Sequence, residues 1–214
     1  MEYLPTVFQT KIGSGIGDIK YYASHLKTVI NGIKQSTGAE KVDIIGYSMG
    51  GLVARWYYQK LDGSTSTGKL IMLATPNHGA EPAAWTMLNE DNNPNMAIVQ
   101  MKPHSSFLQI LNGYNELYCP NKQPNKFPSK GYITIASNDY LTADFFKLFG
   151  YEIPGFKWGD GVVPYDSVRL PHVYNQNVHG SHLSLPDNGY VVSQIKIMLQ
   201  TNDNQYNDWP RGGS

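Results

Sequence analysis

The chain has 214 residues and a mass of 23.9 kDa, with 17 basic and 17 acidic side chains and a formal net charge of zero. This length fits one domain that can bury a sizeable core, and the charge balance argues against a nucleic-acid-binding protein or a polybasic membrane anchor. The single cysteine, Cys119, can neither form an internal disulfide nor complete a zinc ribbon.

Strand and helix patterns alternate along most of the chain. A short strand over residues 6–9 is followed by a glycine-marked loop, and Asp18 is placed to cap a helix over about 19–35 that ends at Gly38. Apolar runs typical of strands in a parallel sheet cover residues 42–45, 69–74, 132–136 and, more weakly, 173–178. Helical periodicity covers about 49–61 and 190–199. This alternation predicts an α/β fold with a mostly parallel sheet flanked by helices.

Two stretches interrupt the alternation. Residues 81–130 are rich in Asn, Pro and Met, with one helical piece near 106–112. A long insertion of this kind predicts a cap or a binding loop. Residues 140–157 crowd together aromatic and aliphatic side chains, either as part of the core or as an apolar rim that meets an apolar substrate.

The strongest functional signal is the hexapeptide Gly46-Tyr47-Ser48-Met49-Gly50-Gly51, which joins the predicted strand 42–45 to the helix that begins near Met49. The turn is so sharp that side chains two residues either side of the serine would collide, so we expect Gly46 and Gly50 to be required there. The turn lifts the Ser48 hydroxyl above the sheet edge. It also places the Met49 N–H at a helix N-terminus, where it can donate to an oxyanion. The alternative is a glycine-rich turn with an incidental serine.

A nucleophilic serine needs a histidine to take its proton and a carboxylate to fix that histidine. Asp160 lies between two glycines in a loop after a predicted strand. We prefer it to the other candidates because flanking glycines let the loop turn the carboxylate inward; the rivals are Asp139, Asp144 and Asp166. A solvated turn aspartate is the alternative for Asp160.

Two histidines, His179 and His182, stand directly before the last predicted helix. We prefer His182 as the general base because it lies further out, past Gly180, on the loop that leaves the strand. His179 at the strand end fits a structural or substrate-side role better. The order of the three residues along the chain is then serine, acid, histidine, which is the order of α/β hydrolases.

Four segments together resemble bacterial triacylglycerol lipases and related esterases of the α/β-hydrolase fold. Residues 42–55 resemble their serine region, 73–79 the strand end that follows it, 159–164 the acid loop and 180–183 the histidine loop. The similarity runs from about residue 7 to residue 199. It implies a carboxylic ester hydrolase with Ser48 as nucleophile, Asp160 as acid, His182 as base and the Met49 N–H in the oxyanion hole.

The resemblance also implies an apolar ester or lipid substrate, an acyl-enzyme intermediate, and neither a metal nor an organic cofactor. Secretion is the expectation for the family, and the chain itself leaves its compartment unknown. The insertion 81–130 is expected to act as a cap that shapes an acyl pocket above Ser48, lined by Trp85, Met87, Met101, Phe107 and Leu108. A polyester depolymerase or a thioesterase with the same triad is the alternative, because the cap selects the acyl group.

The family normally begins with a strand and a His-Gly loop that supplies a second oxyanion N–H, and this part would lie upstream of residue 7. We therefore expect an incomplete or unusual oxyanion hole. The chain is then an N-terminally truncated lipase, a compact variant with a substitute donor, or a hydrolase-like binding module without activity. A sheet that lacks its first strands would expose an apolar flank and favour self-association.

The domain organisation expected from these patterns is a single domain over residues 1–209 with the cap at about 81–130. Residues 210–214 are interpreted as an appended tail. No apolar run approaches the roughly 18 residues of a membrane span. Residues 1–5 lack the basic and apolar regions of a signal peptide, so we expect none.

Overall fold

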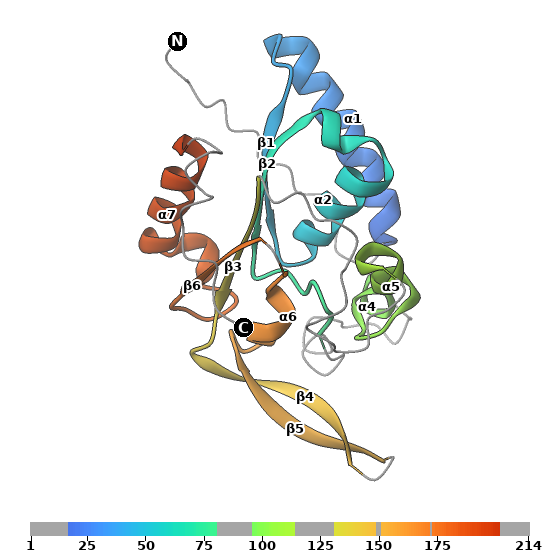
Figure 1. Cartoon of the computed structure of the whole chain (residues 1–214), viewed down its shortest axis with the longest axis vertical. Coiled ribbons are helices and arrows are strands. Elements are labelled where there is room, and N and C mark those ends of the chain that lie inside the picture. The colour runs from blue at the N-terminus through green and yellow to red at the C-terminus, as the bar shows by residue number, and fades with distance from the viewer. Residues whose placement is uncertain (1–16, 81–95, 114–130, 149–150, 172, 202–214) are drawn as a thin grey trace.

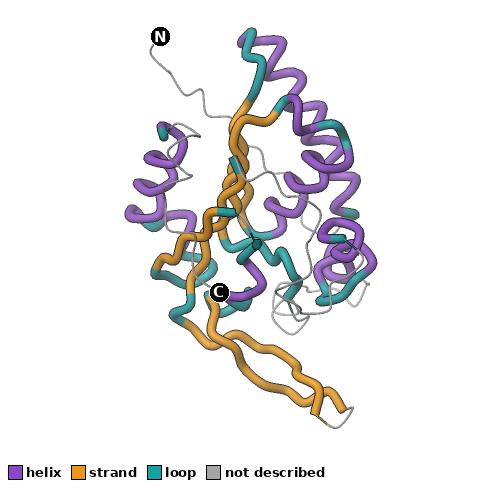
Figure 2. Tube along the Cα trace, viewed as in Figure 1, coloured by secondary structure: helices purple, strands orange, loops and turns teal. Residues whose placement is uncertain are grey.

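The computed structural model describes residues 17–80, 96–113, 131–148, 151–171 and 173–201 (Figure 1). Its central sheet has four parallel strands in the order β1-β2-β3-β6, which are β1 (Val42–Tyr47), β2 (Thr67–Leu73), β3 (Tyr132–Ser137) and β6 (Tyr174–Val178). Helices α1 (Ile19–Thr37) and α2 (Met49–Lys60) cover one face, and α7 (Gly189–Gln200) covers the other (Figures 1 and 2). The predicted α/β architecture is confirmed.

Capping residues fix the ends of the helices. The Asp18 carboxylate accepts the Lys20 N–H at 2.8 Å and starts α1, and Gly38 ends it at a φ of 72°. The Asn188 side chain accepts from the first N–H groups of α7. The predicted strands and helices of the sheet region match these elements to within about two residues at each end. The strand expected over 6–9 lies outside the described residues.

The core consists of two apolar layers, one on each face of the sheet. Successive side chains of β2 alternate between them: Leu70 and Met72 pack towards α1 and α2, whereas Ile71 and Leu73 pack towards α7. β1 differs, because it is the outer strand of the described sheet, and Ile45 is 49% exposed. The strand predicted at 42–45 is confirmed, and it is only partly buried.

The stretch 140–157 forms a β-hairpin that the sequence patterns did not predict. Strands β4 (Tyr140–Leu148) and β5 (Tyr151–Gly159) pair antiparallel and project from the end of the molecule where the sheet strands terminate (Figure 1). Among its described side chains, Leu141, Phe156 and Trp158 are exposed by 57%, 70% and 62%. These three side chains do not belong to the core, and their contact with an apolar substrate stays a prediction.

The described part of the predicted cap contains two short helices, α4 (Met96–Met101) and α5 (Ser106–Asn112). They lie beside the start of α1, at the end of the molecule from which the hairpin projects (Figure 1). Met101, Phe107 and Leu108 are buried in the same apolar layer as α1 and α2. Trp85 and Met87 lie outside the described residues. A cap over 81–130 stays a prediction. Met101, Phe107 and Leu108, which were expected to line its acyl pocket, pack in the core.

A buried polar network ties α5 to α2. Arg55, fully buried in α2, donates to the Asn77 Oδ1 at 3.0 Å and to the Asn112 Oδ1 at 2.5 Å. The Asn112 amide donates in turn to the Asn77 carbonyl at 2.7 Å. The two terminal nitrogens of the guanidinium and the amide groups thus pair with one another where water is excluded, as buried polar groups require. In the part of the chain described, no helix is both long enough and apolar enough to cross a membrane.

Candidate active site

Ser48 occupies the sharp turn between β1 and α2. Its φ of 51° and ψ of −126° are unusual for a residue with a side chain, and such a conformation costs on the order of 1–3 kcal/mol. Backbone bonds hold it in place: the Ser48 N–H donates to the Leu73 carbonyl at 2.8 Å, and the Ser48 carbonyl accepts from the Gly51 N–H at 3.1 Å. The next residue, Met49, begins α2, where the first N–H groups lack partners within the helix.

The glycines around Ser48 have unequal roles. A Cβ on Gly46 would lie 2.5 Å from the Gly51 Cα, so Gly46 is required as expected. A Cβ on Gly50 would meet nothing within 4 Å, and the expected need for glycine there is wrong. The close approach falls instead at Gly51, where a Cβ would lie 2.7 Å from the Thr75 Cγ2. The collision falls at Gly51 because the chain at Thr75 passes close to that residue and not to Gly50.

We expect Gly51→Ala to lower the free energy of unfolding by about 1–3 kcal/mol, because the added methyl group overpacks the contact with Thr75. Gly50→Ala is the matched control and should be neutral or stabilising by up to about 1 kcal/mol, since alanine favours a helix over glycine. Urea denaturation measures both. Equal losses in the two variants would contradict this account of the turn.

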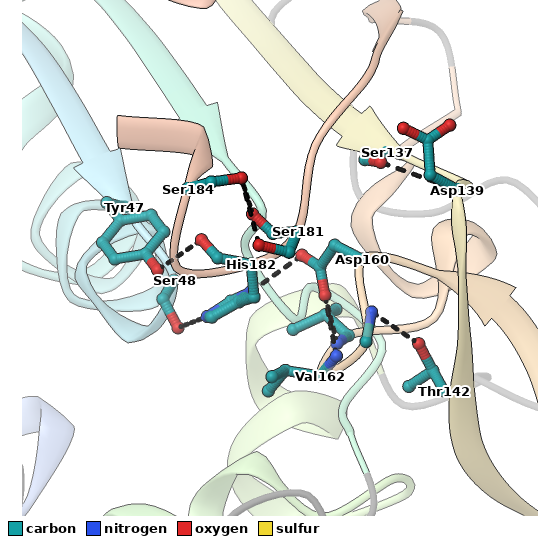
Figure 3. Close-up of polar contacts among 12 residues, drawn as sticks. Tyr47, Ser48, Ser137, Asp139, Thr142, Asp160, Val162, Ser181, His182 and Ser184 are labelled. Atoms are coloured by element: carbon teal, nitrogen blue, oxygen red, sulfur yellow. Dashed lines mark hydrogen bonds and ion pairs between the residues drawn. The ribbon is translucent and has the colours of Figure 1, made fainter. Parts of the chain in front are cut away.

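The structure brings the three predicted triad residues together (Figure 3). His182 Nε2 lies 3.0 Å from Ser48 Oγ, and His182 Nδ1 lies 2.7 Å from Asp160 Oδ2. Asp160 is 1% exposed and His182 is 4% exposed. With its Nδ1–H donating to the carboxylate, the imidazole presents a lone pair at Nε2 to the serine hydroxyl. This arrangement can remove a proton from Ser48, and the catalytic roles of the three residues stay a prediction.

The loop around Asp160 holds its carboxylate with backbone donors. Asp160 Oδ1 accepts from the Val162 N–H at 2.9 Å and the Val163 N–H at 2.7 Å. Gly161 has a φ of 95°, and a Cβ on Gly159 would collide with the Val163 carbonyl. Both flanking glycines are thus needed to turn the carboxylate inward, as the sequence analysis expected.

The acid loop and the histidine loop are also joined through their main chains. The His182 N–H donates to the Asp160 carbonyl at 2.8 Å. The base of the β4–β5 hairpin supports the acid loop, because the Gly161 N–H donates to Oγ1 of the buried Thr142 at 3.2 Å. These contacts position the side chains of both Asp160 and His182.

The rival residues form a separate pair at the surface. His179 Nδ1 lies 2.8 Å from Asp139 Oδ1, and Asp139 Oδ2 accepts from the Gly180 N–H at 2.8 Å. The hydrogen bond from His179 holds the pKa of Asp139 below its usual value. This pair closes the base of the histidine loop and does not face Ser48. Of the other acidic candidates, Asp166 lies in the first turn of α6 (Tyr165–Val168) and Asp144 lies in β4.

Tyr47 is a site residue to which the sequence analysis assigned no role. Its hydroxyl donates to the His182 carbonyl at 2.7 Å (Figure 3). Its place next to Ser48 in the turn was the only signal available in the sequence.

The second oxyanion donor, expected upstream of residue 7, falls outside the described residues. Within the described segments, no group of three or more His, Cys, Asp or Glu side chains is placed to hold a metal ion.

A parallel sheet with a serine turn at its carboxyl edge, and an acid and a histidine on later loops, is the architecture of the α/β hydrolases. The chain belongs to the family described as the alpha/beta hydrolase fold, which matches residues 10–161, more than half of its length.

Solved structures show the same fold. The mature lipase BlEst2 of Bacillus licheniformis aligns with a TM-score of 0.59 and 21% identity over 87% of this chain and 76% of that one. The phospholipase PlaB of Legionella pneumophila aligns with a TM-score of 0.51 and 12% identity over 91% of this chain. This alignment covers 51% of the phospholipase. At these identities the likeness is one of fold.

Proposed function

We propose that the chain hydrolyses carboxylic esters through Ser48, His182 and Asp160. The observation that supports this most directly is the continuous line of contacts from Ser48 Oγ, through the His182 ring at 3.0 Å and 2.7 Å, to the buried Asp160 carboxylate. A serine without a catalytic role would not require a histidine and a buried carboxylate arranged in this way. A buried carboxylate that fixes a histidine tautomer is what an activated serine requires.

In this proposal Ser48 Oγ attacks the ester carbonyl carbon while His182 Nε2 takes the hydroxyl proton. Asp160 keeps the Nδ1 proton in place and stabilises the imidazolium. The Met49 N–H, at the start of α2, donates to the oxyanion of the tetrahedral intermediate. His182 then gives its proton to the leaving alcohol, the acyl group stays on Ser48, and a water molecule activated by His182 releases it as the acid.

The proposed substrate is an apolar ester of the lipid class. Two structures with this fold are described as a lipase and a phospholipase. In addition, the hairpin that supports the acid loop carries the exposed side chains of Leu141, Phe156 and Trp158, which suit contact with an apolar substrate.

We expect the chain to hydrolyse p-nitrophenyl butyrate faster than an unactivated triglyceride by about 10²-fold or more, because a good leaving group demands less oxyanion stabilisation and each oxyanion donor is worth about 10²–10³ in rate. Release of p-nitrophenol and titration of released fatty acid measure the two rates. Ser48→Ala provides the background rate. If the folded chain neither hydrolyses the activated ester nor reacts with a fluorophosphonate, the proposal fails and a binding module remains.

A further inference from the structure

The serine turn contacts the histidine loop through a second side chain. Tyr47 lies between the required Gly46 and the nucleophile candidate Ser48. Its hydroxyl donates to the main-chain carbonyl of His182 at 2.7 Å, and its ring centroid lies 5.1 Å from that of the imidazole, with 35° between the ring planes. One dipeptide therefore carries both the serine and a support for the base.

The Tyr47 hydroxyl stays protonated, and so remains a donor, at every pH where ester hydrolysis would be measured. Burial raises the pKa of Tyr47 to about 12, and the negative charges of Asp160 and Asp187 add to the rise. A phenolate at this position could not donate to the carbonyl, and it would repel the nearby Asp160 carboxylate. The contact is thus insensitive to pH over the working range.

We propose that Tyr47 is a positioning residue for His182, an inference that rests on the proposed function. Besides the contact of its Nε2 with Ser48 Oγ, His182 makes contacts with Tyr47 and Asp160. Its carbonyl accepts from Tyr47, its N–H donates to the Asp160 carbonyl at 2.8 Å, and its Nδ1 meets the Asp160 carboxylate at 2.7 Å. The two contacts with Asp160 tie the histidine to the acid, and the contact with Tyr47 ties its main chain to the turn that holds Ser48.

The consequence concerns the distance between the base and the nucleophile. Because Tyr47 and Ser48 are neighbours in the chain, a shift of the end of β1 carries the serine and the support of the histidine together. The 3.0 Å contact between Nε2 and Oγ is then preserved. The Tyr47 ring also packs beside the imidazole, with 5.1 Å between the two ring centroids.

Tyr47→Phe removes the hydroxyl and keeps the ring. With p-nitrophenyl butyrate we expect kcat to fall about tenfold and KM to stay within about twofold, because a misplaced base slows the chemical step and leaves substrate binding intact. Tyr47→Leu removes the ring as well, and we expect a fall of about 100-fold. Tyr58→Phe is the matched control: Tyr58 is a similarly half-buried tyrosine on α2, packed edge-on against Tyr132. It should keep the full kcat.

A second measurement does not depend on activity. The Nδ1 proton of His182, which lies on the hydrogen bond to Asp160, should give a far-downfield proton resonance in NMR spectra of the whole chain, and His182→Ala assigns it. We expect this resonance to broaden through faster exchange with water in Tyr47→Phe and to stay sharp in Tyr58→Phe. A Tyr47→Phe variant with an unchanged kcat or an unchanged resonance overturns the positioning role. An inactive wild-type chain whose resonance still depends on Tyr47 overturns the proposed function and leaves the positioning role standing.

Discussion

Ser48→Ala should lower kcat for p-nitrophenyl butyrate by on the order of 10⁴- to 10⁶-fold and abolish labelling by a fluorophosphonate. In this variant the Oγ atom is absent, so His182 Nε2 has no hydroxyl at 3.0 Å from which to take a proton, and no covalent intermediate forms. Since the residues of a triad act as a unit, Ser48→Ala combined with His182→Ala should be no slower than either single variant.

The matched control for Ser48 is Ser193→Ala, which alters an exposed serine on α7. It should keep both the activity and the labelling of the wild type. Labelling that persists in Ser48→Ala would place the nucleophile elsewhere. An additive loss in the double variant would show that Ser48 and His182 do not act on the same step.

Asp160→Asn should lower kcat about 10⁴-fold with little loss of fold, because it reverses the tautomer of His182. Oδ1 of residue 160 accepts two backbone N–H groups, from Val162 and Val163, so the oxygen of an asparagine must stay there. Its NH₂ group then faces His182 Nδ1, which must accept a hydrogen bond. The ring proton moves to Nε2, where it blocks proton transfer from Ser48.

Asp139→Asn tests whether this effect is specific to the acid of the proposed triad. Asp139 also meets a histidine at 2.8 Å, but that histidine is the exposed His179. We expect kcat to change by less than about threefold, since neither residue touches Ser48 or its base. Steady-state kinetics of the two asparagine variants decides the assignment. A larger loss for Asp139→Asn would move the acid of the triad to that residue.

The strands and helices of the sheet region could be predicted from the sequence because the patterns that mark them are local. Asp18 and Gly38 mark the ends of α1 through the conformations that a short acceptor side chain and a glycine allow. The flanking glycines of Asp160 and the order of Ser48, Asp160 and His182 along the chain are local in the same sense. They were sufficient to choose the residues that the structure brings together.

The features that were missed depend on long-range pairing. The sequence of the β4–β5 hairpin runs apolar residues together, as in Phe145-Phe146, and has no Asn-Gly or Asp-Gly turn between its strands, so neither alternation nor turn chemistry marks it. The role assigned to Gly50 was wrong because the collision depends on the path of the chain at Thr75. The contact between Tyr47 and His182 joins residues 135 positions apart, and no pattern within either segment indicates it.

The buried network around Arg55 limits which part of the molecule can move to admit a substrate. Lifting α5 away from α2 would break the hydrogen bond between the guanidinium and Asn112 and leave a buried positive charge with one partner fewer. A hydrogen bond to a charged group contributes about 1.5–3 kcal/mol, and the buried side chains of Phe107 and Leu108 add to that cost. At about 3 kcal/mol the undocked conformation is populated below roughly 1%. We therefore expect helix α5 to stay packed against α2 while an ester enters the site.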